Sequence, residues 1–229
     1  MRPFRQRVAF GVKLGLSRAQ ATPLARLKTP RQIQDFVLRI PINFEPESDT
    51  CLSVAEVLKQ RRAHCLEGAF VAACALWIQG HPPLVMDMQA PGDVDHVVAI
   101  FRQGRCWGAI SKTNHVWLRW RDPVYRNLRE LAMSHFHEYF RKRKMTLRTY
   151  SAAIDMRRFD PKIWIGGKEN CWEVEAGIDN ARHFPMITAA QAKQLRPRDP
   201  IERIHADRLR EYPEPAKKPI KRRKQKNRS

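Results

Sequence analysis

A cysteine, a histidine and a serine are spaced in this chain of 229 residues in a way that could support acyl transfer through a thiol. Cys65 falls in the first turn of an expected helix, where unpaired backbone N–H groups and the helix dipole favour a thiolate. His96 opens an apolar, β-branched run, and Ser111 closes the next run along the chain. Acyl transfer by cysteine needs a thiolate, an imidazole that carries its proton, and a third group that orients the imidazole. Cys65, His96 and Ser111 are therefore the candidate catalytic residues; the alternative is that Cys65 is a small buried apolar residue.

The segment 61–80, which carries Cys65, is predicted to contain the central helix of the fold. Between Cys65 and Gln79 the sole charged residue is Glu67, and apolar residues occupy every face of a 3.6-residue helix. Gly80 and the His-Pro-Pro sequence after it end the helix, because Gly adopts the left-handed conformation and Pro cannot continue the hydrogen-bond ladder. We therefore expect this helix to be buried on all sides.

Short strands are predicted to bring the histidine and the serine together. Residues 83–88 and 96–101 are apolar runs separated by a turn-forming segment, and the second run continues through RQGRCWGAIS, which ends at Ser111. If Gln103-Gly104 is the two-residue turn of a hairpin, His96 lies directly opposite Ser111, with Cβ atoms about 4.5–5.5 Å apart. The imidazole and the hydroxyl are then expected on one face of the sheet.

The remaining elements indicate an α+β protein, with the central helix packed on an antiparallel sheet. A short helix is expected over 31–40, and a second is expected to start at Asp122, an N-cap followed by Pro at the first helical position. Further strands are expected over 146–152, 162–165 and 171–174.

The net charge of +20 is concentrated at the two ends of the chain. Residues 1–31 carry eight Lys and Arg and no acid, and residues 217–229 carry eight more, which leaves 27 basic and 23 acidic groups over 32–216. The nearly equal numbers of basic and acidic groups over 32–216 argue against a folded domain that binds the phosphate backbone of a nucleic acid. The basic ends remain candidates for weak contact with nucleic acid or an anionic surface.

Composition also predicts how the chain is divided. A basic arm, unstructured or loosely helical, is expected over 1–28, a folded domain with a C-terminal α/β extension over 29–195, and a basic, disordered tail over 196–229.

The cysteines and the hydropathy restrict the class of protein. Five widely spaced cysteines without a C-x-x-C pair suggest neither a disulfide framework nor a zinc site, and no cofactor motif is present. No apolar run approaches 18 residues, so no transmembrane span is expected. The N-terminus lacks the continuous apolar region of a secretory signal, and the expected location is the cytoplasm.

Three segments, in their order and spacing, resemble the transglutaminase-like branch of the papain-like cysteine enzymes: TPRQIQDFV, RRAHCLEGAFVAACALWIQGHPPLV and DHVVAIFRQGRCWGAIS. In that family the motif cysteine opens the central helix, the histidine opens a strand, and an acidic residue lies on the next strand, four positions after a tryptophan. Cys65 and His96 match the first two, and Trp107 matches the tryptophan, which puts Ser111 where the family usually has Asp. The resemblance covers residues 29–115, and the chain beyond it looks like an extension shared with bacterial members of the branch. The resemblance implies a papain-like core.

The serine at position 111 departs from the family pattern. A serine can accept the imidazole N–H and orient the ring, but it has no charge with which to stabilise an imidazolium. Asn114 is the next candidate, since asparagine orients the histidine in papain-type triads, but it reaches His96 only if the chain turns after the strand. For the oxyanion, the backbone N–H of Cys65 is one donor, and Gln60 and Asn43 are the candidate side-chain amides.

The residues and the resemblance together predict a thiol-dependent peptidase, amidase or transamidase that acts on an amide or ester of a protein or peptide. Hydrolysis and transamidation share an acyl-enzyme, and the sequence leaves both open. Two other classes also stay open: a catalytically silent transglutaminase-like module that binds peptides or partners, and a basic-tailed adaptor for nucleic acid or an anionic surface.

Overall fold

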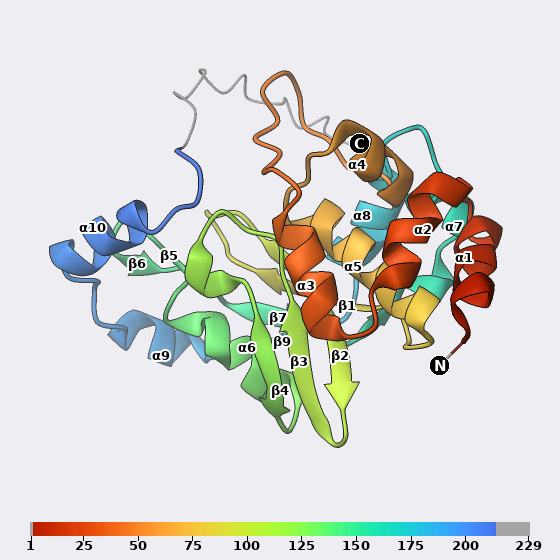
Figure 1. Ribbon diagram of the computed structural model, residues 1–229. Coiled ribbons are helices and arrows are strands. Elements are labelled where there is room, and N and C mark those ends of the chain that lie inside the picture. Colours follow the sequence, from red (N-terminus) through yellow and green to blue (C-terminus); the bar gives the residue numbers. More distant parts are fainter. Residues whose placement is uncertain (1, 214–229) are drawn as a thin grey trace, which may run out of the picture.

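The computed structural model describes residues 2–213 of the chain, in which helices pack against a central antiparallel sheet (Figure 1). This confirms the α+β class expected from the sequence. The sheet has the strand order β4-β3-β2-β1-β7-β9, and β8 also pairs with β1. Its strands are β1 Leu84–Gln89, β2 His96–Gln103, β3 Cys106–Ile110, β4 Arg121–Tyr125, β7 Thr149–Ser151, β8 Ile154–Asp155 and β9 His183–Pro185. A separate pair consists of β5 Phe140–Arg141 and β6 Lys144–Met145.

The central helix is α5, Cys65–Gln79, as the apolar pattern predicts. Its residues from Leu66 to Gln79 are buried except for Trp77, and Gly80 ends it in the left-handed conformation with φ +99°. One face of the sheet covers α5, through side chains such as Val97 and Phe101 of β2. A helix without a wide solvent face is stable only inside such a shell, because each of its faces must be removed from water.

Further helices complete the shell around α5, and Figure 1 shows most of them grouped on the same side of the sheet. They are α1 Phe4–Lys13, α2 Arg18–Arg26, α3 Pro30–Leu38, α4 Val54–Gln60, α7 Pro161–Trp164 and α8 Trp172–Asp179. Trp164 is fully buried here and stacks on Trp77, with ring centroids 6.4 Å apart. The helix over 31–40 is thus confirmed as α3, which begins with Thr29 as N-cap.

The opposite face of the sheet carries a second, smaller core. Met86, Val98 and Ile100 point to this side and pack with α6, Leu128–Phe136, and with Leu147. The remaining elements are α9 Ala189–Gln194, α10 Pro200–Arg208 and the 3₁₀ turns Val116–Leu118 and Met156–Arg158. No helix within residues 2–213 is long and apolar enough to cross a membrane.

The prediction of an N-terminal basic arm is wrong, because residues 4–26 form two helices that belong to the main core. Leu14, Leu16 and Leu24 are buried against α5, while most of the arginines of α1 and α2 stay at the surface. The buried guanidinium of Arg7 donates to Gln79 Oε1 at 2.8 Å, which ties α1 to the end of α5. The first 28 residues therefore belong to the folded body.

The C-terminal boundary is also wrong in part. Residues 200–208 are helical, and the chain after them runs beside residues 114–116, where His115 and Arg210 form an antiparallel bridge. The expected disorder therefore does not begin at residue 196; residues 214–229 lie outside the described part of the chain.

The hairpin between β2 and β3 has a register different from the expected one. Gln103 pairs with Cys106, so the turn is Gly104-Arg105, with φ +60° at Gly104. Glycine with positive φ at the first turn position is typical of a type II′ hairpin, which explains why the turn forms one residue later than expected. The expected partners each shift by two residues, and a shift of two leaves every side chain on its expected face.

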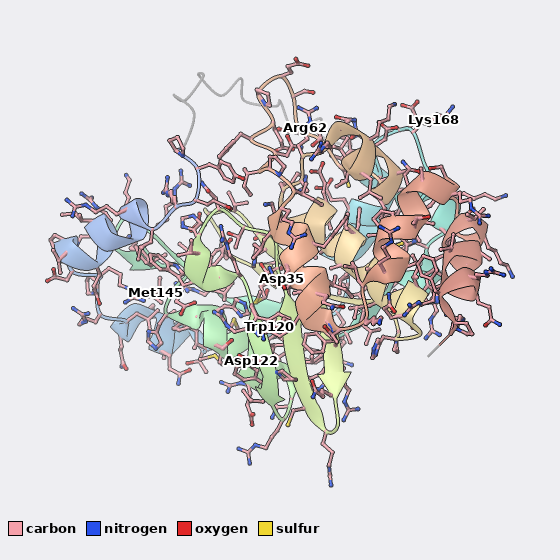
Figure 2. The ribbon with its side chains drawn as sticks, viewed as in Figure 1. Asp35, Arg62, Trp120, Asp122, Met145 and Lys168 are labelled. Atoms are coloured by element: carbon pink, nitrogen blue, oxygen red, sulfur yellow. The ribbon has the colours of Figure 1, made fainter. Side chains whose placement is uncertain are left out.

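Three local predictions beyond the hairpin are wrong. Asp122, labelled in Figure 2, lies on β4 and does not start a helix. Pro123 is tolerated there because β4 is at the sheet edge, and α6 begins instead after Asn127, whose side chain accepts from Glu130 N at 2.9 Å. The strands expected over 162–165 and 171–174 are the helices α7 and α8; Asp160 caps α7, and Pro161 takes its first position.

Candidate active site

The thiol of Cys65 lies at the N-terminus of α5, beside the start of β2. Cys65 is the first residue of the helix, its side chain is partly exposed, and its Sγ is 3.8 Å from the carbonyl oxygen of Asp95. The side chain of Asp95 is used elsewhere, because its Oδ1 accepts the Ala90 N–H at 2.7 Å. The thiol thus meets β2 at the residue that precedes His96.

His96 and Ser111 are brought together as the sequence predicts. His96 Nε2 lies 2.9 Å from Ser111 Oγ, and both residues are buried. With this nitrogen occupied by the serine, Nδ1 is the ring atom left to serve the thiol. The three residues proposed from the sequence therefore form one constellation.

A glutamine that sequence reasoning missed fixes the position of Ser111. The side chain of Gln34, on α3, donates from Nε2 to the Ser111 carbonyl and accepts from the Ser111 N–H, both at 2.9 Å. Gln34 is itself buried, so these two bonds satisfy polar groups that would otherwise be costly. The signal available in the sequence was a glutamine beside Ile33 on the buried side of α3.

A second histidine, His64, flanks the thiol on its other side. It is the N-cap residue of α5, and its Nε2 lies 3.0 Å from the Thr50 carbonyl oxygen, 3.3 Å from Glu67 Oε1 and 3.8 Å from Glu45 Oε1. The only sequence signal was the order His-Cys-Leu-Glu, which resembles a capping box with histidine as the cap.

The carboxylate of Glu67 organises this end of α5. It is fully buried and accepts from the backbone N–H groups of His64 and Leu52, each at 2.9 Å, and from the Thr50 hydroxyl at 2.7 Å. These donors satisfy the oxygens of a buried carboxylate that lies two residues after Cys65, in the first turn of α5.

The surroundings of Cys65 favour its thiolate. Burial raises the pKa of the Cys65 thiol, but hydrogen bonds and charge interactions with the rings of His64 and His96 outweigh it and lower the pKa well below its usual value. For His64 the effects have the opposite sign. Burial lowers its pKa, but its hydrogen bond with Cys65 and the charges of Cys65 and Glu67 outweigh burial and raise the pKa to about 10. The geometry thus supports a thiolate between two imidazoles.

Two further rings enclose His96. The centroids of His135 and Tyr139 lie 6.3 and 6.2 Å from that of His96. His135 is completely buried, and burial together with the charges of Arg121 and His96 lowers its pKa well below the usual value, so it is neutral. Tyr139 donates its hydroxyl to the Val94 carbonyl, which places it over the loop that leads into β2.

Asn114 does not orient His96. Its Nδ2 donates to the Tyr212 carbonyl and its Oδ1 accepts from the Tyr212 N–H, both at 2.9 Å. Its amide therefore holds the chain after α10, together with an ion pair of 2.5 Å between Arg119 and Glu211. The prediction that asparagine replaces the acidic residue is contradicted by these bonds.

Neither proposed oxyanion amide is directed at the thiol. Asn43 Nδ2 donates to Thr50 Oγ1 at 2.8 Å and to Glu67 Oε2 at 3.1 Å, so it belongs to the support of the carboxylate. Gln60 lies exposed and donates to Glu56 Oε2 at 3.0 Å. The N–H of Cys65 remains, in the first turn of α5, where backbone donors lack intrahelical acceptors.

Close against the site, Gly68 allows α5 to approach the segment after β3. A Cβ on Gly68 would lie 2.2 Å from Lys112 Cβ, so the helix has no room for a side chain at this position. Lys112 comes directly after Ser111 and is fully buried, and burial lowers its pKa to about 8.

The described residues contain no group of three or more His, Cys, Asp or Glu side chains able to hold a metal ion. No protein-family model matches the chain, and no curated protein matches it in sequence. The resemblance to transglutaminase-like enzymes therefore stays a prediction that rests on the motif residues.

Proposed function

We propose that this protein is a thiol-dependent acyl-transfer enzyme that acts on an amide or ester. The observation that carries the proposal is the position of Cys65 at the start of α5, with its Sγ 3.8 Å from the carbonyl of the residue before His96 and the His96 ring held by Ser111 at 2.9 Å. The rings of His64 and His96 lower the pKa of the thiol. A lowered thiol pKa at a partly exposed helix N-terminus is typical of a nucleophile and not of a structural cysteine.

In the proposed reaction the Cys65 sulfur adds to the carbonyl carbon of the substrate, and the oxyanion that forms meets the N–H of Cys65. The leaving amine or alcohol takes a proton from His96 as its bond to the carbonyl carbon breaks. Water or an amine then attacks the thioester and returns a proton to His96, which releases the product and restores the thiolate.

The proposal is tested by acylation of the full chain with p-nitrophenyl acetate, with intact mass measurement and peptide mapping as the readout. We expect one acetyl group on Cys65, released by attack of water or of an added simple primary amine. The Cys65→Ala variant should take up no acetyl group at this position, and Cys106→Ala, which alters another partly exposed cysteine, should behave as wild type.

A different result would favour the catalytically silent module. If Cys65 of the folded protein is neither acylated by the ester nor alkylated faster than Cys106, the thiol is not a nucleophile. Release of the acetyl group in buffer alone would indicate hydrolysis, whereas release only with a simple primary amine, and not from the unfolded acyl-protein, would indicate transamidation.

A further inference from the structure

The His96–Ser111 pair lacks the negative charge that an acidic residue supplies at this position in the resembling family. Ser111 Oγ is a neutral partner at 2.9 Å, and the nearby His135 ring is buried and neutral. A neutral partner can set the orientation of a ring but adds no charge to the site. Any charge that stabilises the thiolate in addition to His96 must therefore come from another group.

His64 has the partners that His96 lacks. Its Nε2 faces an oxygen from each of three residues: Glu67 Oε1 at 3.3 Å, the Thr50 carbonyl at 3.0 Å and Glu45 Oε1 at 3.8 Å. An N–H donated toward these acceptors leaves Nδ1 for the adjacent residue, Cys65, whose thiol pKa the His64 ring lowers. Protonation of both ring nitrogens satisfies both sides at once.

We propose that two histidines divide the work of this site: His64, paired with Glu67, is a cation that stabilises the Cys65 thiolate throughout the reaction, and His96 alone carries the proton. This assignment rests on the proposed acyl transfer. It gives Glu67 the electrostatic role that an acidic residue at position 111 has in the resembling family, but through a ring on the helix side of the thiol.

The proton balance of the reaction is consistent with this division. The thiol S–H bond breaks as its proton moves to His96, and the leaving group takes that proton when the carbonyl carbon–nitrogen or carbon–oxygen bond breaks. The attacking water or amine gives one proton back to His96. His64 neither gains nor loses a proton in the cycle, so its charge favours each state in which the sulfur is anionic.

Other charged groups also face this pair and must be held constant in a test. Glu45 approaches from the loop before α4, Glu175 of α8 acts on His64, and His96 and Tyr139 face Cys65 from the sheet side. None of them is altered by substitution of His64 itself, whose backbone N–H still donates to Glu67 at 2.9 Å.

The test is the pH at which Cys65 is half-maximally alkylated by iodoacetamide, read by mass spectrometry of full-length protein. His64→Gln should raise this midpoint by about one to three pH units, because an adjacent cation is lost. His64→Lys, which restores a positive charge, should bring the midpoint back toward wild type. Glu45→Gln should raise it by a smaller amount, since Glu45 is the more distant carboxylate.

Turnover of p-nitrophenyl acetate separates the two histidines. The loss of rate in His64→Gln should be largely recovered at pH 9, where the thiol ionises without help, whereas the loss in His96→Gln should persist at every pH. An unchanged alkylation midpoint in His64→Gln, or a larger shift in His96→Gln than in His64→Gln, overturns the assignment. If wild type is never acylated but His64→Gln still shifts the midpoint, the acyl-transfer function fails while the His64–Cys65 ion pair stands.

Discussion

Ser111 Oγ lies 2.9 Å from His96 Nε2, and both residues are buried beside the neutral ring of His135. A carboxylate at this position would face the imidazolium across a medium with little screening, so even one charge there should have a measurable effect.

Ser111→Asp should therefore increase the rate of Cys65 alkylation at pH 5.5, because a charged partner favours the protonated His96 and with it the thiolate. One unit of pKa corresponds to about ten-fold in rate, or about 1.4 kcal/mol. Ser111→Ala should lower the rate by less, through a loosened ring. Ser111→Asn is the matched control, since it has the size of Asp without the charge; equal rates for Asn and Asp would show that charge at position 111 has no effect.

Cys65 should be the first cysteine to react with iodoacetamide at pH 6. Hydrogen bonding to Cys171 and burial raise the pKa of the Cys51 thiol, and burial raises that of Cys74, so both should resist until the protein unfolds. Cys106 is partly exposed and measures the effect of access alone. Peptide mapping after partial labelling gives the order, and labelling of Cys106 before Cys65 would contradict the assignment of the nucleophile.

Gln34→Leu should slow Cys65 alkylation and destabilise the fold. The substitution removes both bonds to the Ser111 backbone and leaves a buried N–H and a buried C=O unpaired, at a cost of about 1–3 kcal/mol for each group left unsatisfied. Arg31→Leu, on the exposed side of the same helix, is the control and should have little effect on either property. Urea unfolding and alkylation rates together show whether the glutamine acts on the serine or on stability alone.

Leu24→Ala should cost about 2–5 kcal/mol of unfolding free energy, because it leaves a cavity at a completely buried position. Val12→Ala, at a residue of α1 that is 44% exposed, should change it little. Thermal or urea unfolding measures both. Equal stability of Leu24→Ala and wild type would mean that the first two helices do not belong to the core.

The raised pKa of His64, caused by Cys65 and by Glu67, should make the contribution of this histidine to stability fall with rising pH, while the lowered pKa of the Cys65 thiol acts in the opposite direction. Since the pKa of His64 is raised to about 10 in the folded state, its contribution is fully present below pH 6.5 and is lost as the pH rises to about 10. Lys112 acts in the opposite direction above pH 8, since burial lowers its pKa to about 8. The difference between Cys65→Ala and the Cys65→Ala/His64→Gln double variant isolates the pairing of His64 with Glu67, because both retain Lys112 and neither has the thiol; a difference that does not shrink between pH 7 and pH 10 would exclude that pairing.

Part of the site could be predicted from sequence because its signals are local. The run from Cys65 to Gln79 is apolar on every face, which fixes both the helix and the place of the cysteine within it. The predicted pairing of His96 with Ser111 was wrong by two residues, yet their side chains still meet, since a strand repeats every two residues.

The missed features depend on distant partners. Nothing near Asn114 reveals that its amide binds Tyr212, 98 residues later, and nothing near Ser111 reveals Gln34 on another element. In residues 1–28, the exposed arginines suggested a basic arm. The apolar residues between them form a buried face only because α5 packs against them, and the local sequence does not show this. The tryptophans at 164 and 172 favour strands by intrinsic propensity. At the first of them, the Asp160 cap and Pro161 at the first helical position start a helix instead, because local capping outweighs the weak strand propensity.

The close approach of Gly68 to Lys112 sets a minimum distance between α5 and the segment that carries Ser111. At this position the backbone of α5 packs directly on the Cβ and Cγ atoms of Lys112, the residue that follows Ser111. The spacing from helix to serine is therefore set by steric repulsion, which rises steeply, and not by an attractive contact that could stretch. A single methyl group at position 68 would push Lys112, and with it Ser111, away from α5. The distance between the helix and the serine therefore cannot accommodate even one added carbon atom.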